Sequence, residues 1–414
     1  MKNRWLIAAS AVGIHVSIGS VYAWSVFNLP MEEAFGWTKN QVALTFSLAI
    51  FFLGLSAAIM GHFVERRGPR ASGLVAGTFW GLGMLGAGVA ASMENMYLLW
   101  LSYGVLGGIG LGVGYITPVS TLVKWFPDRR GLATGLAIMG FGFGAMIGAP
   151  IFSYLIENLS IAMTFFIMGA IYMVIMYASA LYLERPPEGW MPDDMKEAIA
   201  SGKQKKVEDL SQLTANEAAK TGPFYGLWVM MFINISCGIA VIYSASPLAQ
   251  ESIGLTATEA AAVVGLMSLF NGLGRIGWAS FSDYLGRANT YMTFFVIQIV
   301  AFYLLPNITS VVLFQVVLFT ILTCYGGGFA TLPAFIGDLF GTKELGAIHG
   351  YVLTAWAAAG LAGPQIAAYV RTVTGSYTMT LYIFAGVFVI ALITAMLMRA
   401  YINKARKAME LAAA

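Results

Sequence analysis

Long apolar runs along nearly the whole chain constrain this sequence more than any other feature. Each run is long enough to cross a bilayer as a helix, which needs about 20 apolar residues. Helices satisfy their own backbone hydrogen bonds in lipid, where the backbone finds no water. We therefore predict an all-α integral membrane protein with twelve transmembrane helices, over residues 5–27, 40–61, 71–92, 96–122, 131–156, 161–183, 223–248, 259–281, 288–306, 310–336, 347–370 and 377–399.

The composition excludes most other classes of protein. Of 414 residues, 58% are hydrophobic and 10% are charged, whereas soluble domains carry about 25% charged residues. A soluble enzyme, a nucleic-acid-binding protein and a disordered chain are therefore excluded. Cys237 and Cys324 lie inside apolar runs, and His15, His62 and His349 lack the spacing of metal ligands. We expect no metal site and no cofactor.

The distribution of basic residues predicts the orientation. If the N-terminus is cytoplasmic, all but three of the 23 Lys and Arg residues lie in the termini and the inward loops. Lys39 and Arg371 then face outward, and Arg275 lies within a predicted helix. Because inward loops are enriched in Lys and Arg, we predict that both termini are cytoplasmic.

The sequence divides into two similar halves. A polar segment over residues 185–222 separates six predicted helices from the other six. Such duplication indicates a transporter built from parallel repeats, with its substrate site between them near the midplane. We predict six-helix bundles over 1–184 and 223–414, joined by a cytoplasmic linker over 185–222. The repeat is seen in prolines that recur 214–217 residues apart, Pro30, Pro118 and Pro150 as Pro247, Pro333 and Pro364.

The linker has one local structural signal. Thr214 and Glu217 have the spacing of a capping box ahead of a short helical stretch, Ala215 to Lys220. We interpret the segment as a solvated linker with one surface helix, because nothing in its sequence indicates a partner or a regulatory site.

Two segments resemble a known family. Residues 61–70 resemble the signature of the loop between the second and third helices in the major facilitator superfamily, and residues 279–287 repeat part of it. Glycine permits the tight turn, and the acids and arginines can pair between helix ends. We therefore expect a gate or latch rather than a substrate site. The predicted gating residues are Gly61, Glu65, Arg66, Gly68, Asp283, Gly286 and Arg287, with Asp128, Arg129 and Arg130 of the segment below.

A narrower resemblance covers residues 110–118 and 124–133, which include the run Trp-Phe-Pro-Asp-Arg-Arg-Gly. They are similar to the signature of the branch that holds the monocarboxylate transporters and the oxalate–formate antiporters. Over the whole chain the sequence is most like the bacterial L-lactate-type monocarboxylate transporters. The resemblance implies a major facilitator fold, a multi-pass protein of the bacterial inner membrane, and facilitated or proton-coupled movement of small organic anions.

Arg275 is the most informative single residue. It lies about two turns inside the eighth predicted helix, with Asn271 one turn away. A guanidinium at that depth is costly unless it is paired or faces water, and no acid lies in the interior of any predicted helix. A substrate carboxylate can be its partner, since it matches the guanidinium fork. The alternative is a structural arginine that is bonded to helix carbonyls or that snorkels toward the cytoplasmic surface. Family members also carry an anion-binding arginine in this helix.

Departures from the family narrow the range of expected substrates. Oxalate-type antiporters add a lysine in the eleventh helix, where this chain has Trp356, and animal monocarboxylate transporters have an aspartate where this chain has Asn271. One central charge favours one carboxylate. His15 is our candidate for proton coupling, because its unperturbed titration range suits that step; a neutral histidine bonded to a neighbouring helix is the alternative.

The remaining candidates surround this arginine in the predicted cavity. Tyr115, Tyr325 and Asn271 can bond a carboxylate or hydroxyl, with ordinary bonding between helices as the alternative. Trp356, Phe329 and Leu136 can form apolar walls, with core packing as the alternative.

These features together predict a transporter and not an enzyme. We expect secondary active transport of lactate or pyruvate with a proton, by alternating access. We expect the protein to be surrounded by membrane lipid, to have no nucleic-acid partner and to function as a monomer. The main alternative is an organic anion antiporter of the oxalate–formate type. A carboxylate receptor and a membrane enzyme are less favoured, since the chain shows no sizeable cytoplasmic domain and no paired intramembrane acids.

Overall fold

The computed structural model describes residues 2–201 and 209–413, and all regular structure within them is helical. Short 3-10 or π turns join some of the helices. The helices are α1 (Arg4–Gly19), α2 (Ser25–Phe35), α3 (Lys39–Ser92), α4 (Met96–Leu99), α5 (Gly108–Trp125), α6 (Arg130–Asn158), α7 (Ile161–Tyr182), α8 (Asp193–Ala200), α9 (Ala215–Ala218), α10 (Gly222–Ile253), α11 (Ala257–Leu285), α12 (Arg287–Leu304), α13 (Val311–Phe340), α14 (Leu345–Val352), α15 (Thr354–Thr374) and α16 (Thr378–Ala413).

Ten helical segments of the described chain are long and apolar enough to cross a membrane. One of them, α3, consists of two helices, because Gly68 interrupts it with a φ of 83°. The 29-residue α11 is not among the ten; it carries the polar residues Asn271 and Arg275. Counting α3 twice and adding α11 gives the twelve predicted crossings.

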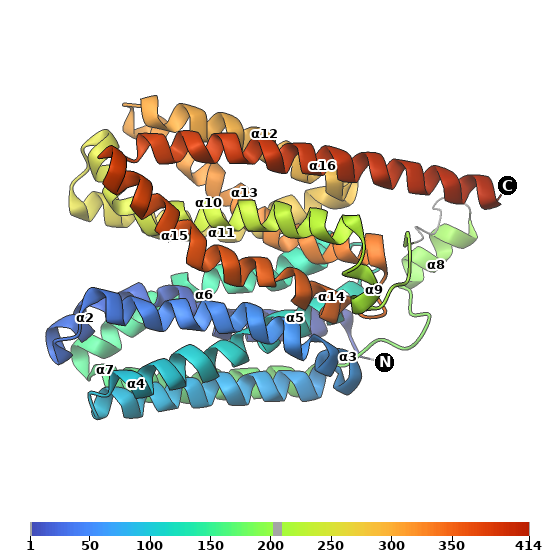
Figure 1. Cartoon of the computed structure of the whole chain (residues 1–414). Helices are drawn as coiled ribbons and strands as arrows, with labels where there is room; N and C mark the ends of the chain where they lie inside the picture. Colours follow the sequence, from blue (N-terminus) through green and yellow to red (C-terminus); the bar gives the residue numbers. More distant parts are fainter. Residues whose placement is uncertain (1, 202–208, 414) are drawn as a thin grey trace.

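The helices form two groups that lie side by side (Figure 1). The first group runs from α1 to α7 and the second from α10 to α16. They meet where α6 packs against α11 and where α3 packs against α14 and α15. Both chain termini, α8 and α9 lie at one end of the molecule (Figure 1), which we call the linker end.

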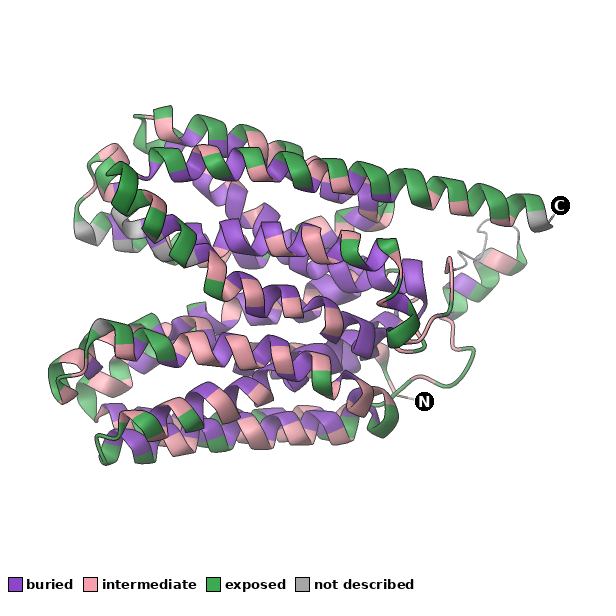
Figure 2. Ribbon diagram, viewed as in Figure 1, coloured by how far each residue is buried: buried purple, intermediate pink, exposed green. Residues whose placement is uncertain are grey.

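Burial follows the pattern of a bundle surrounded by lipid. Buried residues face the interiors of the two groups and the interface between them, while the outer helix faces are exposed (Figure 2). Many exposed side chains are large and apolar, and such an extensive apolar surface would be costly in water. The arrangement fits a multi-pass membrane protein. Examples on four outer helices are Leu82, Val174, Val312 and Leu397, each at least half exposed.

Glycines let the two groups approach each other closely. A Cβ atom on Gly131 of α6 would lie 2.0 Å from the Ala279 carbonyl oxygen of α11. A Cβ atom on Gly350 of α14 would lie 2.0 Å from the Ala57 carbonyl oxygen of α3. Small residues permit such helix contacts in membranes. Both contacts therefore depend on glycine.

Candidate functional site

Arg275 lies on α11 at the interface between the two groups, and its side chain is fully buried. Its Nε donates to the Asn271 side-chain oxygen at 3.3 Å, one turn earlier on the same helix. Its Nη1 donates to the Ile138 carbonyl of α6 at 3.4 Å. Its Nη2 is buried without a hydrogen-bond partner. Among the described residues no carboxylate forms an ion pair with Arg275, so its charge lacks a protein counter-ion.

Aromatic rings enclose the guanidinium. The guanidinium carbon of Arg275 lies 5.2 Å from the ring centre of Phe329 and 5.6 Å from that of Phe141. The Trp356 ring packs edge-on against Phe329, with ring centres 4.6 Å apart. These contacts stabilise a cation and exclude water, but they provide no negative charge.

Several buried polar atoms near Arg275 also lack partners. They are the hydroxyls of Tyr22, Tyr115 and Tyr325 and the indole nitrogen of Trp356. The Tyr22 and Tyr115 hydroxyls interact with the Arg275 guanidinium, and the Tyr22 hydroxyl interacts with that of Tyr325, but none of these contacts has the geometry of an ordinary hydrogen bond. We call Arg275, Tyr22, Tyr115, Tyr325 and Trp356 the central cluster. Buried polar groups are normally hydrogen-bonded, so five groups in one place without a well-formed hydrogen bond to any described residue indicate a site for a polar ligand.

The central cluster draws on both groups of helices. Tyr22 lies in the 3-10 turn after α1, and Tyr115 lies on α5. Arg275, Tyr325 and Trp356 lie on α11, α13 and α15. The Tyr115 and Trp356 ring centres are 5.3 Å apart across the interface. A ligand bound here would touch both groups.

His15 on α1 lies beside this cluster. Its ring stacks on Tyr115, with ring centres 5.1 Å apart. Its Nδ1 lies 2.7 Å from the Ala137 carbonyl oxygen, and its Nε2 lies 3.1 Å from the Tyr115 carbonyl oxygen. A neutral imidazole has only one N–H, whereas an imidazolium has two. Both contacts can therefore be hydrogen bonds only when His15 is protonated.

The structure brings most of the predicted site residues together. Asn271 orients Arg275, and Tyr115, Tyr325, Phe329 and Trp356 surround it. Leu136 is half-buried on α6, and its role as an apolar wall stays a prediction.

Sequence reasoning missed Tyr22 and Phe141 as members of the site. The sequence carried a signal for Tyr22, because it follows His15 by seven residues and so falls on the same face of the predicted helix over 5–27. Phe141 had no comparable signal, since it contacts Arg275 only through the packing of α6 against α11.

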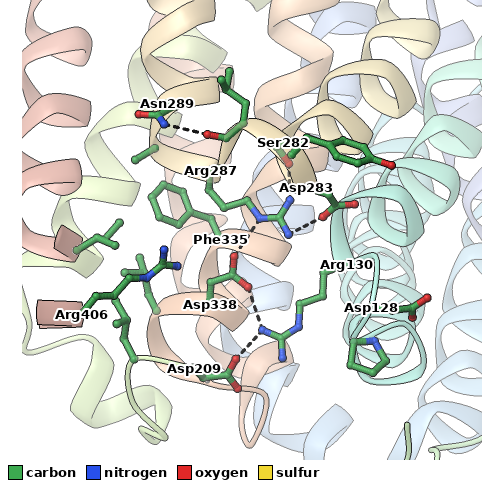
Figure 3. A pocket seen from close by; sticks show the side chains of 18 of the residues that line it. Asp128, Arg130, Asp209, Ser282, Asp283, Arg287, Asn289, Phe335, Asp338 and Arg406 are labelled. Carbon is green, nitrogen blue, oxygen red and sulfur yellow. Dashed lines mark hydrogen bonds and ion pairs between the residues drawn. The ribbon is translucent and has the colours of Figure 1, made fainter. Parts of the chain in front are cut away.

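A second group of charged residues lies at the linker end, where Asp283 and Arg287 of α11 and α12 meet Arg130 of α6 and Asp338 of α13 (Figure 3). Arg130 pairs with Asp338 at 3.0 Å and with Asp209 of the linker at 2.7 Å. Arg287 pairs with Asp338 at 3.0 Å and with Asp283 at 2.7 Å. We call these five residues the linker-end cluster.

The linker-end cluster joins the two groups of helices. Arg130 belongs to the first group, and Asp338 to the second. A second contact joins an acid of the second group to the first group. The Asp283 carboxylate accepts hydrogen bonds from the backbone N–H groups of Gly131 and Leu132, at 2.9 and 3.0 Å, at the N-terminus of α6. A carboxylate is favourable at that position of a helix. The interface is therefore closed at this end.

Glu65 forms a separate contact across the same interface. Its carboxylate pairs with Lys124 at 2.8 Å and accepts from Ser120 at 2.9 Å, both on α5. It also accepts from the backbone N–H of Gly346 at 2.7 Å, at the start of α14 in the second group. This contact closes the linker end beside Gly61, where a Cβ atom would lie 2.5 Å from the Ala347 Cα.

The other predicted gating residues have smaller roles or none. Gly68 and Gly286 adopt φ values of 83° and 85°, which glycine permits at a turn. Asp128 pairs with Arg4 at 2.8 Å, within the first group. Arg66 and Arg129 are exposed and form no ion pair with any described residue, so their gating role stays a prediction.

A cavity of about 910 Å³ opens beside the linker-end cluster. Arg130, Asp209, Asp338 and Arg406 are among its lining residues (Figure 3). In the described part of the chain no group of three or more His, Cys, Asp or Glu residues could hold a metal ion.

Known proteins match the chain over most of its length. The family model of the Major Facilitator Superfamily matches residues 9–364 and again 227–412. The oxalate:formate antiporter of Oxalobacter formigenes is 28% identical, over 90% of this chain and 86% of its own. Monocarboxylate transporter 13 of Rattus norvegicus is 26% identical, over 94% of this chain and 86% of its own.

A solved structure shows the same fold. The fucose:proton symporter of Escherichia coli superposes with a TM-score of 0.74 at 14% identity, covering 96% of this chain and 99% of its own. The prediction of an all-helical fold of this type is confirmed.

Proposed function

Because the chain belongs to the Major Facilitator Superfamily, whose members are membrane transporters and not enzymes, we propose that it carries a small monocarboxylate together with a proton. Lactate and pyruvate are the substrates that fit best. Relatives named as a monocarboxylate transporter and an oxalate:formate antiporter support small organic anions as the substrate class.

The substrate carboxylate binds at Arg275. The observation that supports this most strongly is the buried Nη2 of Arg275, which has no partner. A buried charge without compensation is costly, and a carboxylate relieves that cost by accepting two parallel hydrogen bonds from the guanidinium. The hydroxyls of Tyr22, Tyr115 and Tyr325 complete the set of donors for the carboxylate and for the 2-hydroxyl or 2-oxo group.

One positive charge selects a monoanion. By resemblance to the oxalate-type antiporters, Trp356 takes the place of their second cation, and its neighbour Phe329 is also apolar. A dianion would leave one negative charge uncompensated in a buried site, which is very unfavourable. We therefore favour monocarboxylate transport over oxalate–formate exchange.

His15 carries the proton. Its two ring nitrogens both face carbonyl oxygens, so protonation replaces one repulsive contact with a hydrogen bond. The ring also stacks on Tyr115, a residue of the central cluster. Proton binding and substrate binding can thus influence each other through one side chain.

The two bundles, 1–184 and 223–414, rock about the central cluster during transport. The linker end faces the cytoplasm of a bacterial cell, so the linker over 185–222 and both termini are cytoplasmic. The ion pairs of the linker-end cluster and the Glu65 contact close that side. Opening toward the cytoplasm requires both sets of contacts to break. Each step uses a single chain, which supports function as a monomer.

Uptake of labelled lactate into proteoliposomes tests this function. We expect accumulation when the external medium is acidic and the interior alkaline, and its loss when an uncoupler collapses the gradient. Empty liposomes serve as the control. Uptake that is independent of the pH gradient and requires an internal anion would favour the alternative, an organic anion antiporter.

A further inference from the structure

We infer that Asp209 of the linker is a gating residue, which holds the two bundles closed at the linker end by sharing Arg130 with Asp338. The linker therefore acts as a latch and is more than a tether. This role goes beyond the proposed function and does not depend on which anion is carried.

The latch is fixed to the second bundle by the residues that follow Asp209. The backbone N–H of Leu210 donates to the Asp338 carbonyl at 3.0 Å, and that of Leu213 donates to the Phe340 carbonyl at 2.9 Å. The Ser211 hydroxyl donates to the Leu339 carbonyl at 2.7 Å. These bonds satisfy three successive carbonyls at the C-terminal end of α13, where a helix leaves them unpaired.

The helix after this segment strengthens the attachment. The capping box predicted at Thr214 and Glu217 is formed, and α9 ends at Ala218 rather than at Lys220. The backbone N–H of Ala215 donates to the Glu344 carboxylate at 2.8 Å, just before α14. The pKa of Glu217 is held below its usual range, chiefly by the hydrogen bond from the Thr214 backbone and then by that from its side chain.

Asp209 reaches from this anchored segment to the first bundle. Its carboxylate lies 2.7 Å from Arg130 Nη1 on α6. The side chains of Arg130 and Asp209 are only 13% and 11% exposed, so water screens the pair much less than it screens a surface pair. Gln212 donates to the second oxygen of Asp209 at 2.9 Å, which fixes the carboxylate toward Arg130 (Figure 3).

The start of the linker is fixed to the first bundle. The Trp190 indole N–H donates to the Trp125 carbonyl at 3.1 Å, and Arg185 donates to the Val64 carbonyl at 3.1 Å. The linker is thus attached to one bundle before α8 and to the other after Asp209. Separation of the bundles at the linker end must therefore break the Asp209–Arg130 pair, which directly opposes opening.

Removal of the latch charge should open the linker end without substrate. Nitroxide labels on Arg66→Cys and Tyr284→Cys report the opening, because these exposed positions lie on opposite bundles at the linker end. The native Cys237 and Cys324 are buried and can be replaced by alanine. Double electron–electron resonance on the protein in nanodiscs, with no substrate present, measures the distance distribution.

We expect Asp209→Asn to raise the ratio of long to short distances about tenfold, and Asp209→Glu to restore it. Asp193→Asn is the matched control, since Asp193 lies in the same linker, is largely exposed and, among the described residues, forms an ion pair with Lys196 alone. Ser211→Ala, which loosens the anchor and keeps the charge, should shift the ratio in the same direction by less. It also tests the latch if Asp209→Asn does not fold.

An Arg130→Gln background separates a latch from a general structural role. There, Asp209→Asn should cause no further shift, because its partner is already absent. The inference is overturned if Asp209→Asn and Ser211→Ala both leave the distances unchanged, or if Asp193→Asn changes them equally. If the wild type takes up no lactate but the latch variants behave as expected, the proposed substrate is contradicted and the latch is not.

Discussion

Replacement of Arg275 by methionine removes the positive charge of the central cluster and keeps an apolar side chain of similar length. The bound carboxylate would then be buried without a cation. Breaking a buried pair in this way costs about 3–5 kcal/mol, which corresponds to at least a ~100-fold rise in Kd for lactate. Arg275→Lys keeps the charge but loses one charge-assisted hydrogen bond of about 1.5 kcal/mol, so we expect roughly a tenfold rise.

The same substitution should not destabilise the substrate-free protein. Arg275 is fully buried with an unpartnered Nη2, and replacing buried ionic groups with apolar ones of similar volume is often neutral or stabilising. We expect the substrate-free Arg275→Met protein to unfold at the wild-type temperature or above it. Lactate at 100 times the wild-type Kd stabilises the wild type by about 2.7 kcal/mol, and after a ~100-fold rise in Kd the same concentration should stabilise the variant by about 0.4 kcal/mol or less.

Tryptophan fluorescence during thermal unfolding in detergent, with lactate titrated, measures both quantities. Arg371→Met is the control, because Arg371 is exposed and pairs with Glu251 away from the central cluster. It should keep the lactate-dependent shift. A wild-type Kd in Arg275→Met would refute the binding role. A large fall in unfolding temperature with binding preserved would show that Arg275 is structural.

Three other substitutions test the remaining features of the site. His15→Gln should keep lactate counterflow and lose accumulation driven by an acidic exterior, because glutamine cannot take up the proton; unchanged accumulation would make His15 structural. Oxalate should compete poorly with labelled lactate in the wild type. Trp356→Lys should weaken lactate transport and improve competition by oxalate. Strong competition by oxalate in the wild type would show that a second cation reaches the site. Gly350→Ala should shift the Arg66–Tyr284 label distance toward the open form, because its Cβ would lie 2.0 Å from the Ala57 carbonyl oxygen; an unchanged distance would mean that the contact yields easily.

The helices and the central arginine were predictable because their signals are local. The length of an apolar run is enough to predict a membrane crossing. A single charged residue inside such a run indicates a functional site whatever the arrangement of the helices. Arg275 met both conditions. The break between α14 and α15 at Leu353 was not predicted, since the apolar run continues through it.

The latch and the place of Tyr22 in the central cluster depend on tertiary contacts. Arg130 pairs with Asp209 and Asp338, which lie 79 and 208 residues away, and no local pattern links them. Tyr22 carried a helical spacing signal from His15, but the sequence alone does not show which helix faces it. The linker therefore read as solvated chain, whereas the structure places Asp209 in the linker-end cluster.

The most direct test of whether one carboxylate travels with one proton is to record the transport current on a solid-supported membrane and to measure the external pH during uptake. A monoanion and a proton carry no net charge together, so a lactate gradient should make the external medium alkaline during uptake without a current. Exchange of oxalate for formate moves one net charge per cycle and needs no proton. A lactate-dependent current without external alkalinisation would contradict proton-coupled transport of a monocarboxylate.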